Sequence, residues 1–188
     1  MKKAIGVVTG IVFIFSLMNG CQDQQPKMKQ GQQLAPLITP DQLRQLEEAA
    51  KSSPKEPAGW IALGNALYDM NQCARRMGPQ QQSGCLSAAN AYQKALELDP
   101  NNVNALVDMG TALWAGGQLE KALTEHRKAI KLDPNQPHAH MNAGITLSDL
   151  GRTKEAIKEF EEYLRLSPNA QNAADVRKMV DNMKAGRK

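Results

Sequence analysis

The chain has 188 residues, of which 41% are hydrophobic and only 4% aromatic, and its formal net charge is +4. This composition argues against a β-sandwich or β-barrel and favours an all-helical protein. The modest charge gives no indication of a nucleic-acid partner. Three cysteines are too few for a disulfide framework, and none of them forms a closely spaced metal-type pair.

The N-terminus has the features of an export signal. Two lysines precede an apolar run over residues 4–18, which is shorter than the ~20 apolar residues of a membrane-spanning helix. Residues 1–20 are therefore predicted to be a signal peptide. The small Gly20 directly before Cys21 resembles a bacterial lipobox, and this resemblance implies acylation of Cys21, palmitate included. The alternative is an ordinary cleaved signal that leaves Cys21 free.

Residues 21–39 are predicted to be a flexible linker behind the lipid. Six of the eighteen residues from Gln22 to Thr39 are glutamine, and such a segment buries too little apolar area to offset its ordering entropy. Gln22 rather than Asp follows the cysteine. By resemblance to the enterobacterial sorting rule, this residue implies the periplasmic face of the outer membrane.

From residue 40 onward the chain repeats itself. Pro100, Pro134 and Pro168 are 34 residues apart, and two apolar segments with helical spacing lie between successive prolines. A glycine in the first segment and an alanine in the second allow two helices to approach closely. The pattern predicts three helix-turn-helix units, with capping helices before and after them. The predicted boundaries are 40–56 for the front cap, 57–102, 103–136 and 137–168 for the units, and 169–188 for the rear cap.

The repeated pattern resembles the tetratricopeptide repeat family. The resemblance implies an all-α, right-handed α-solenoid whose first helices line a concave peptide-binding groove. Leu67, His126 and Tyr163 depart from the Tyr, Phe and Ala of the family pattern, and His126 is expected to be a core residue. The matching positions are Trp60, Leu63, Gly64, Leu67, Ala88, Tyr92, Ala95 and Pro100; then Leu106, Met109, Gly110, Leu113, Ala122, His126, Ala129 and Pro134; then His140, Ala143, Gly144, Leu147, Ala156, Phe160, Tyr163 and Pro168.

The first unit is twelve residues longer than the others. Cys73 and Cys85 both fall at position 17 of the repeat, so they stand at the two ends of an inserted loop over residues 74–84. We hypothesise a disulfide between them, which an exported compartment permits. Two alternatives are a pair of free buried cysteines and a soft-metal or redox site with Met70 and Met77 as further ligands.

The resemblance also implies which residues line the groove. They are mixed in character, with aliphatic side chains, two aromatic rings, polar amides and aspartates. The members that hold a C-terminal carboxylate do so with Lys and Arg, but the equivalent positions here contain no such cation. The groove is therefore expected to bind an extended or helical segment with apolar side chains and a Lys or Arg. The predicted lining residues are Ile61, Asn65, Tyr68, Val107, Asp108, Thr111, Trp114, Met141, Asn142 and Ile145.

The sequence contains no phosphate loop, nucleophile elbow, zinc-protease motif or haem-attachment motif. We therefore expect no enzymatic activity, no cofactor and no small-molecule substrate. The predicted function is that of an interaction scaffold in the bacterial cell envelope, held to the membrane by lipid on Cys21, that binds another envelope protein or a peptide segment. The alternatives are an accessory lipoprotein for pilus, secretin or outer-membrane protein assembly, and a soft-metal or redox protein using Cys73 and Cys85.

Overall fold

The computed structural model describes residues 38–75 and 79–186. The predicted signal peptide, Cys21, Met77 and all but the end of the linker lie outside this part of the chain. Every regular element in the described part is helical, so the all-α prediction is confirmed. Within these residues, no helix has the length and apolarity that crossing a bilayer requires.

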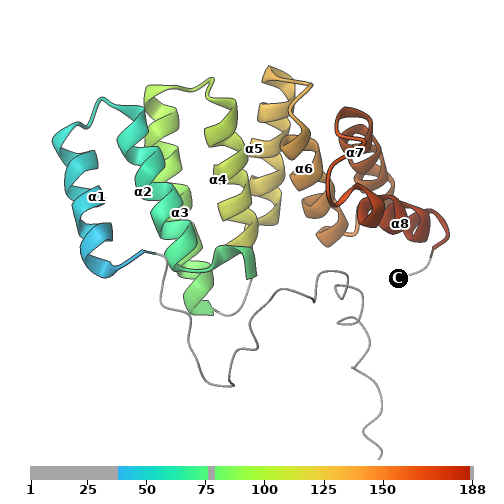
Figure 1. Ribbon diagram of the computed structural model, residues 1–188, viewed down its shortest axis with the longest axis horizontal. Helices are drawn as coiled ribbons and strands as arrows, with labels where there is room; N and C mark the ends of the chain where they lie inside the picture. The colour runs from blue at the N-terminus through green and yellow to red at the C-terminus, as the bar shows by residue number, and fades with distance from the viewer. Residues whose placement is uncertain (1–37, 76–78, 187–188) are drawn as a thin grey trace, which may run out of the picture. The chain divides into compact units, whose positions relative to one another are not determined.

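The described elements are eight α-helices and one short 3₁₀-helix, η1 (Figure 1). Those of the front half are α1 (Pro40–Ser52), α2 (Pro57–Met70), η1 (Cys73–Arg75), α3 (Pro79–Leu98) and α4 (Val103–Ala115). Those of the rear half are α5 (Leu119–Leu132), α6 (Pro137–Asp149), α7 (Thr153–Leu166) and α8 (Ala173–Lys184).

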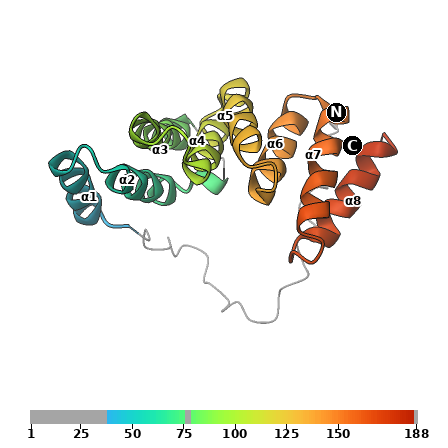
Figure 2. The ribbon, with the colours of Figure 1, turned by 90° about the horizontal axis from the view of Figure 1, so that it is seen from above.

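The helices form three antiparallel pairs that stack one behind another. The pairs are α2 with α3, α4 with α5, and α6 with α7, and each pair also contacts the next one in the chain. Helix α1 packs on α2 at the front, and α8 packs on α7 at the rear. Figure 2 shows this succession from above, and it is the arrangement of an α-solenoid.

Local signals in the sequence explain where the helices begin. The Thr39 side chain accepts a hydrogen bond from the Gln42 backbone N–H at 3.2 Å, and the Gln42 side chain accepts one from the Thr39 N–H at 2.8 Å. This capping box satisfies two N–H groups at the start of α1. The Asn102 side chain does the same for α4 by accepting from the Ala105 N–H at 3.0 Å. Helices α2 and α6 begin with a proline, whose fixed φ suits the first helical turn.

Each pair has a glycine where its two helices approach closely, as the repeat pattern predicts, and the structure shows that this glycine faces a ring. A methyl group added to Gly64 would lie 2.6 Å from the Tyr92 ring, and one added to Gly144 would lie 2.6 Å from the Phe160 ring. Gly110 faces the His126 ring in the same way. The equivalent glycine of all three units is therefore required for the close approach of the two helices.

His126 is a core residue, as expected, but it fits its site less well than a phenylalanine would. Its side chain is fully buried, and its Nδ1 lies 3.4 Å from the Thr146 hydroxyl oxygen, while its Nε2 has no hydrogen-bond partner among the described residues. Burial lowers the pKa of this imidazole to about 4. The ring is therefore neutral in the folded protein at neutral pH.

Two boundaries differ from the sequence prediction. The insertion in the first unit is only partly a loop, because α3 begins at Pro79 and residues 79–84 extend it by about one and a half turns. At the rear, α8 begins at Ala173, since a turn follows Pro168. The Tyr163 hydroxyl donates a hydrogen bond to the Asn172 side chain, which joins this turn to α7.

Candidate functional site

The first helix of each pair, α2, α4 and α6, presents most of the predicted binding residues. Val107 is the exception, because it is 6% exposed and belongs to the hydrophobic core, so its prediction as a lining residue is wrong. The remaining side chains are exposed or half-buried. We define the first-helix surface as Ile61, Asn65, Tyr68 and Asp69 on α2, Asp108, Thr111 and Trp114 on α4, and Met141, Asn142, Ile145 and Asp149 on α6.

Side-chain hydrogen bonds join α4 to α6 across this surface. The Asn142 amide donates to the Thr111 hydroxyl at 2.9 Å, and the Trp114 indole N–H donates to the Asp149 carboxylate at 2.8 Å. At the start of α6, the Gln136 amide donates to the Asn104 side-chain oxygen at 3.1 Å. Residues that were predicted as independent contacts for a ligand therefore also fix the spacing of the two helices.

These hydrogen bonds determine which polar atoms remain for a ligand. The Thr111 hydroxyl donates to the Val107 carbonyl at 2.8 Å, so it accepts from the Asn142 NH₂ group, and the Asn142 side-chain oxygen is left as an acceptor. The Tyr92 hydroxyl donates to the Asn65 side-chain oxygen at 2.7 Å, which leaves the Asn65 NH₂ group as a donor. The surface thus offers one amide donor and one amide acceptor to a polypeptide backbone.

Tyr92 contributes to this surface although the sequence assigned it only to packing. It occupies the slot that holds His126 and Phe160 in the other pairs, but its hydroxyl reaches across to Asn65 on α2. A signal was present in the sequence, because tyrosine is the only residue of the three with a hydroxyl. What the sequence lacked was the direction in which that hydroxyl points.

Three aspartates lie on the first-helix surface, and they differ in their surroundings. Asp149 accepts the hydrogen bond from Trp114, and Asp69 is exposed. Asp108 is half-buried, and burial raises the pKa of its carboxyl, an effect that the nearby His138 partly opposes. Burial, followed by the charges of Asp69 and Asp108, also raises the pKa of the Tyr68 hydroxyl.

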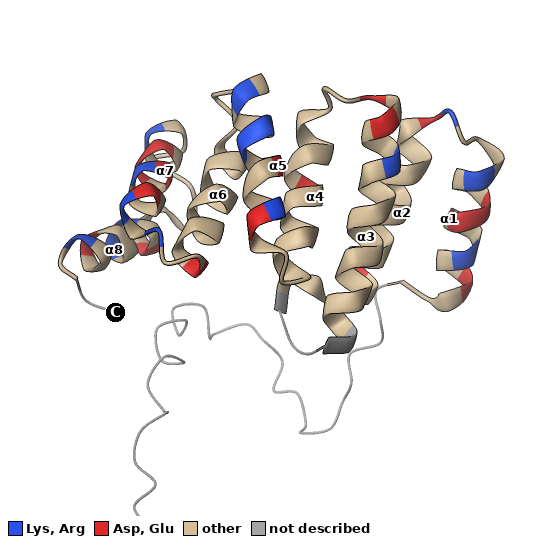
Figure 3. Ribbon diagram, turned by 180° about the vertical axis from the view of Figure 1, so that it is seen from behind, with Lys and Arg blue, Asp and Glu red and all other residues tan. Residues whose placement is uncertain are grey.

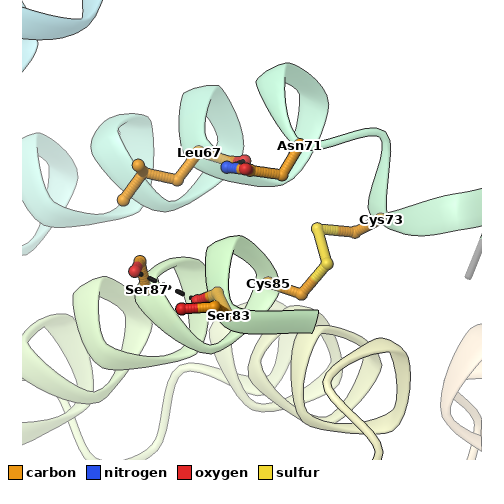
Figure 4. Close-up of a disulfide and its surroundings, with 6 residues drawn as sticks. All are labelled: Leu67, Asn71, Cys73, Ser83, Cys85 and Ser87. Atoms are coloured by element: carbon orange, nitrogen blue, oxygen red, sulfur yellow. Dashed lines mark hydrogen bonds between the residues drawn. A yellow bond between two sulfur atoms is a disulfide. The ribbon is translucent and has the colours of Figure 1, made fainter. Parts of the chain in front are cut away.

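The structure joins Cys73 and Cys85 as a disulfide at the point where the insertion begins and ends (Figure 4). Their Cα atoms are 5.7 Å apart, which is within the usual range for such a bond. Both cysteines are at most 1% exposed, and Ala115 is buried with them while Tyr68 and Trp114 pack against this cluster. The disulfide therefore supports both aromatic residues of the first-helix surface.

The end of α2 and the first turns of α3 lie close together beside this disulfide. The Asn71 side chain donates to the Leu67 carbonyl at 2.8 Å and so caps the end of α2 (Figure 4). A methyl group added to Gly84 would collide with that Asn71 side chain. A glycine at this position therefore allows the extended α3 to run past the end of α2.

The described residues give no support to a metal site. Residues 38–75 and 79–186 contain no group of three or more His, Cys, Asp or Glu side chains arranged to hold a metal ion. In the disulfide, Cys73 and Cys85 offer no thiolate to a soft metal. His138 and His140 do not act together, since His138 is exposed whereas the ring of His140 binds Glu159 and the Pro134 carbonyl.

Comparison with known families identifies the helix pairs. A family model described as "TPR repeat" matches residues 110–151, and models described as "Tetratricopeptide repeat" match residues 91–124 and 137–170. The chain is a tetratricopeptide repeat protein. No curated protein matches its sequence.

Solved structures of other proteins share the fold of this tetratricopeptide repeat (TPR) protein. The crystal structure of MamA superimposes with a TM-score of 0.64 at 18% identity, covering 78% of each chain. The thermophilic TPR protein TTC0263 of Thermus thermophilus gives 0.61 at 17% identity, covering 77% of this chain and 72% of the other. The first TPR domain of human RPAP3 gives 0.58 at 21% identity, covering 71% of this chain and 95% of that domain. At these identities the likeness concerns the fold alone.

The charges of this TPR protein are distributed unevenly between its first and second helices. Helices α2, α4 and α6 contain Asp69, Asp108 and Asp149 but no Lys or Arg. Figure 3 shows the same contrast, with α4 and α6 free of the blue that marks Lys and Arg on α5, α7 and α8. The first-helix surface is therefore the acidic side of a chain that is basic as a whole.

Proposed function

We propose that the protein is a non-enzymatic scaffold of the bacterial cell envelope that binds a polypeptide segment on its first-helix surface. TPR folds serve as protein–protein interaction scaffolds. The observation that carries the proposal is the pair of amide groups on this surface, because Asn65 offers a donor and Asn142 an acceptor while their other atoms are fixed by Tyr92 and Thr111. Amides that are held in this way can pair with the backbone of a bound segment without a further loss of side-chain entropy.

Photo-crosslinking in native membranes tests this proposal. A photoreactive side chain at Met141, which is half-buried on α6, is expected to give adducts with a defined partner. The same group at Thr124, which is exposed on α5, serves as the control. The variant Ile145→Glu is expected to remove the adduct at position 141 while the helical circular dichroism signal remains. Equal adducts from both positions would locate the interaction elsewhere on the molecule.

We propose further that lipid on Cys21 anchors the chain at the periplasmic face of the outer membrane. The support comes from the sequence alone, namely the short apolar run, Gly20 before the cysteine and Gln22 after it. Labelling with an alkyne fatty acid is expected to mark the wild type but not Cys21→Ala. Fractionation is expected to place the labelled protein with outer-membrane proteins. A mature protein with an unmodified thiol at Cys21 would contradict lipid anchoring.

A further inference from the structure

The junction between α2 and α4 differs from the rest of the first-helix surface in the state of its carboxylates. Asp69 lies near the end of α2, and Asp108 lies in the middle of α4. Among residues 38–75 and 79–186, neither carboxylate takes part in a hydrogen bond or an ion pair. By contrast, Asp149 at the next junction accepts a hydrogen bond from Trp114. Among the three aspartates of the first-helix surface, the two on α2 and α4 are therefore the ones without a hydrogen bond or an ion pair within the described residues.

The half-buried carboxylate of Asp108 costs free energy that the described part of the fold offsets only in part. Taking a charge partly out of water raises its free energy unless a counter-charge or hydrogen bonds compensate it. Burial raises the pKa of the Asp108 carboxyl and His138 opposes this rise in part, while α2, α4 and α6 contain no Lys or Arg. An unpaired charge at such a place is typical of a site that serves binding rather than stability.

Tyr68 completes the chemistry of this junction. Its ring is half-buried and packs against the Cys73–Cys85 cluster, so it is held in place by a cross-linked part of the chain. It also packs against the core cluster that contains Val107 and Met109, the neighbours of Asp108 in α4, and Asp69 follows it in the chain. Burial raises the pKa of its hydroxyl, and the charges of Asp69 and Asp108 raise it further. An aromatic ring beside carboxylates is a favourable environment for a cation.

We infer that Tyr68, Asp69 and Asp108 form a subsite for a Lys or Arg side chain of the bound polypeptide segment. The inference rests on the proposed function, since it assigns one side chain of the segment that occupies the first-helix surface. Charge complementarity is the argument for the occupant, because three aspartates stand on helices that carry no cation of their own. The half-buried Ile61, Met141 and Ile145 on the same surface are suited to apolar residues flanking the basic one.

Selection from a random dodecamer peptide library on the full-length protein in detergent tests the subsite. Wild type, Asp108→Asn and Asp175→Asn are used in parallel. Asp108→Asn keeps the size of the side chain and removes its charge, so we expect it to fold at least as well as the wild type. Asp175 is an exposed aspartate on α8, outside the first-helix surface, and Asp175→Asn is therefore the matched control.

Peptides selected on the wild type and on Asp175→Asn are expected to be enriched in Lys or Arg at one position between apolar residues. Asp108→Asn is expected to lose this enrichment. When a selected peptide is synthesised, replacing its basic residue by Gln should weaken binding to the wild type about tenfold but to Asp108→Asn less than about twofold. Selected peptides without a preferred basic position, or enrichment that survives in Asp108→Asn, would overturn the inference.

The variant Ile145→Glu separates this inference from the proposed function. One outcome is that the selected peptides lack a basic residue, bind the wild type and fail to bind Ile145→Glu. This outcome would support binding on the first-helix surface and refute only the subsite. Peptides that bind Ile145→Glu as well as the wild type, or a selection that yields no peptides, would overturn both. The double variant Lys27→Gln, Lys29→Gln tests whether a lysine of the chain's own linker occupies the subsite. If this variant binds the selected peptide more tightly than the wild type does, the linker is the occupant, and a partner's side chain is refuted.

Discussion

The two junctions between first helices are built differently, although the repeats they join have the same design. Between α4 and α6, side-chain hydrogen bonds from Asn142, Trp114 and Gln136 hold the helices at a fixed spacing. Beside α2, the buried Cys73–Cys85 disulfide joins η1 to α3, and Tyr68 of α2 and Trp114 of α4 both pack on the cluster around it. The side chains from α2 and α4 at the front therefore pack on a cross-linked cluster, and the carboxylates of Asp69 and Asp108 remain available to a ligand.

This difference suggests that, in the irregular first repeat, the groups that stabilise the fold are not the groups that bind a ligand. Between α4 and α6, the polar side chains already form hydrogen bonds that stabilise the stack, so few of their donors and acceptors remain for a ligand. At the front, the insertion adds a cross-link within the first unit, and neither Asp69 nor Asp108 forms a hydrogen bond or an ion pair among residues 38–75 and 79–186. Two agents, a reductant and acid, should therefore weaken the front and the rear of the molecule separately.

Loss of the disulfide should have the largest effect, and it should act on the front. Replacing Cys73 and Cys85 by serine is expected to lower the free energy of unfolding by about 3 kcal/mol, because the bond closes a loop of this size in the unfolded chain. Hydrogen exchange should accelerate at the end of α2 and the start of α3 while α6 and α7 keep their protection. Two thiols that alkylate in the native purified protein would show that the bond does not form.

Acid should act on the rear, through His126. The pKa of its imidazole is about 4 in the folded protein, whereas its ordinary value, which applies in the unfolded chain, is 6.5. As the pH falls, the unfolded chain therefore binds a proton at a higher pH than the folded protein does. The stability from its neutral form is present above pH 6.5 and is lost as the pH falls towards 4. The loss between about pH 7.5 and about pH 5 is expected to be about 2 kcal/mol, measured by urea unfolding.

The matched variant is His126→Phe, which introduces the residue type that stands at the equivalent position of the next pair, Phe160. It should remove this acid sensitivity, since a phenyl ring does not titrate and fills the same slot against Gly110. It should also be more stable at neutral pH, because the buried Nε2 atom, which has no partner among the described residues, is gone. An unchanged pH dependence in His126→Phe would show that other groups cause the acid sensitivity.

The smallest effect is expected for the hydrogen bond between Trp114 and Asp149. Trp114→Phe keeps an aromatic ring on the disulfide cluster but removes the indole N–H that donates to Asp149. The free energy of unfolding should therefore fall by about 1 kcal/mol. A double-mutant cycle with Asp149→Asn measures the pairwise term. Additive effects of the two substitutions would mean that this bond does not couple α4 to α6.

The features that repeat were predictable from the sequence, and those that occur once were not. Gly64, Gly110 and Gly144 recur at equivalent positions, so the close approach of two helices at each of them followed from the pattern, although the rings that they face did not. The burial of Val107 was missed because its position in the repeat does not show how far the neighbouring helices close over it. The helical start of α3 was missed because one glutamine-rich insertion has no second copy with which to compare it.

The binding surface was predicted as a set of residues but not as a network. The resemblance to the family placed Trp114, Asn142 and Thr111 on the same side of successive helices. It could not show that they bond to one another, because this depends on distances between helices that no local pattern encodes. The available carboxylates at the front were identifiable only after the bonded ones at the rear had been assigned.

The extra length of α3 has a consequence for access to the protein. This helix has 20 residues, whereas α5 and α7 have 14 each, so its first turns project about 9 Å past the level at which its counterparts begin. The chain enters the stack along the same border, where α1 starts (Figure 1). A large neighbour that approaches from the border where α1 starts would meet this projecting tip before it reached the repeats.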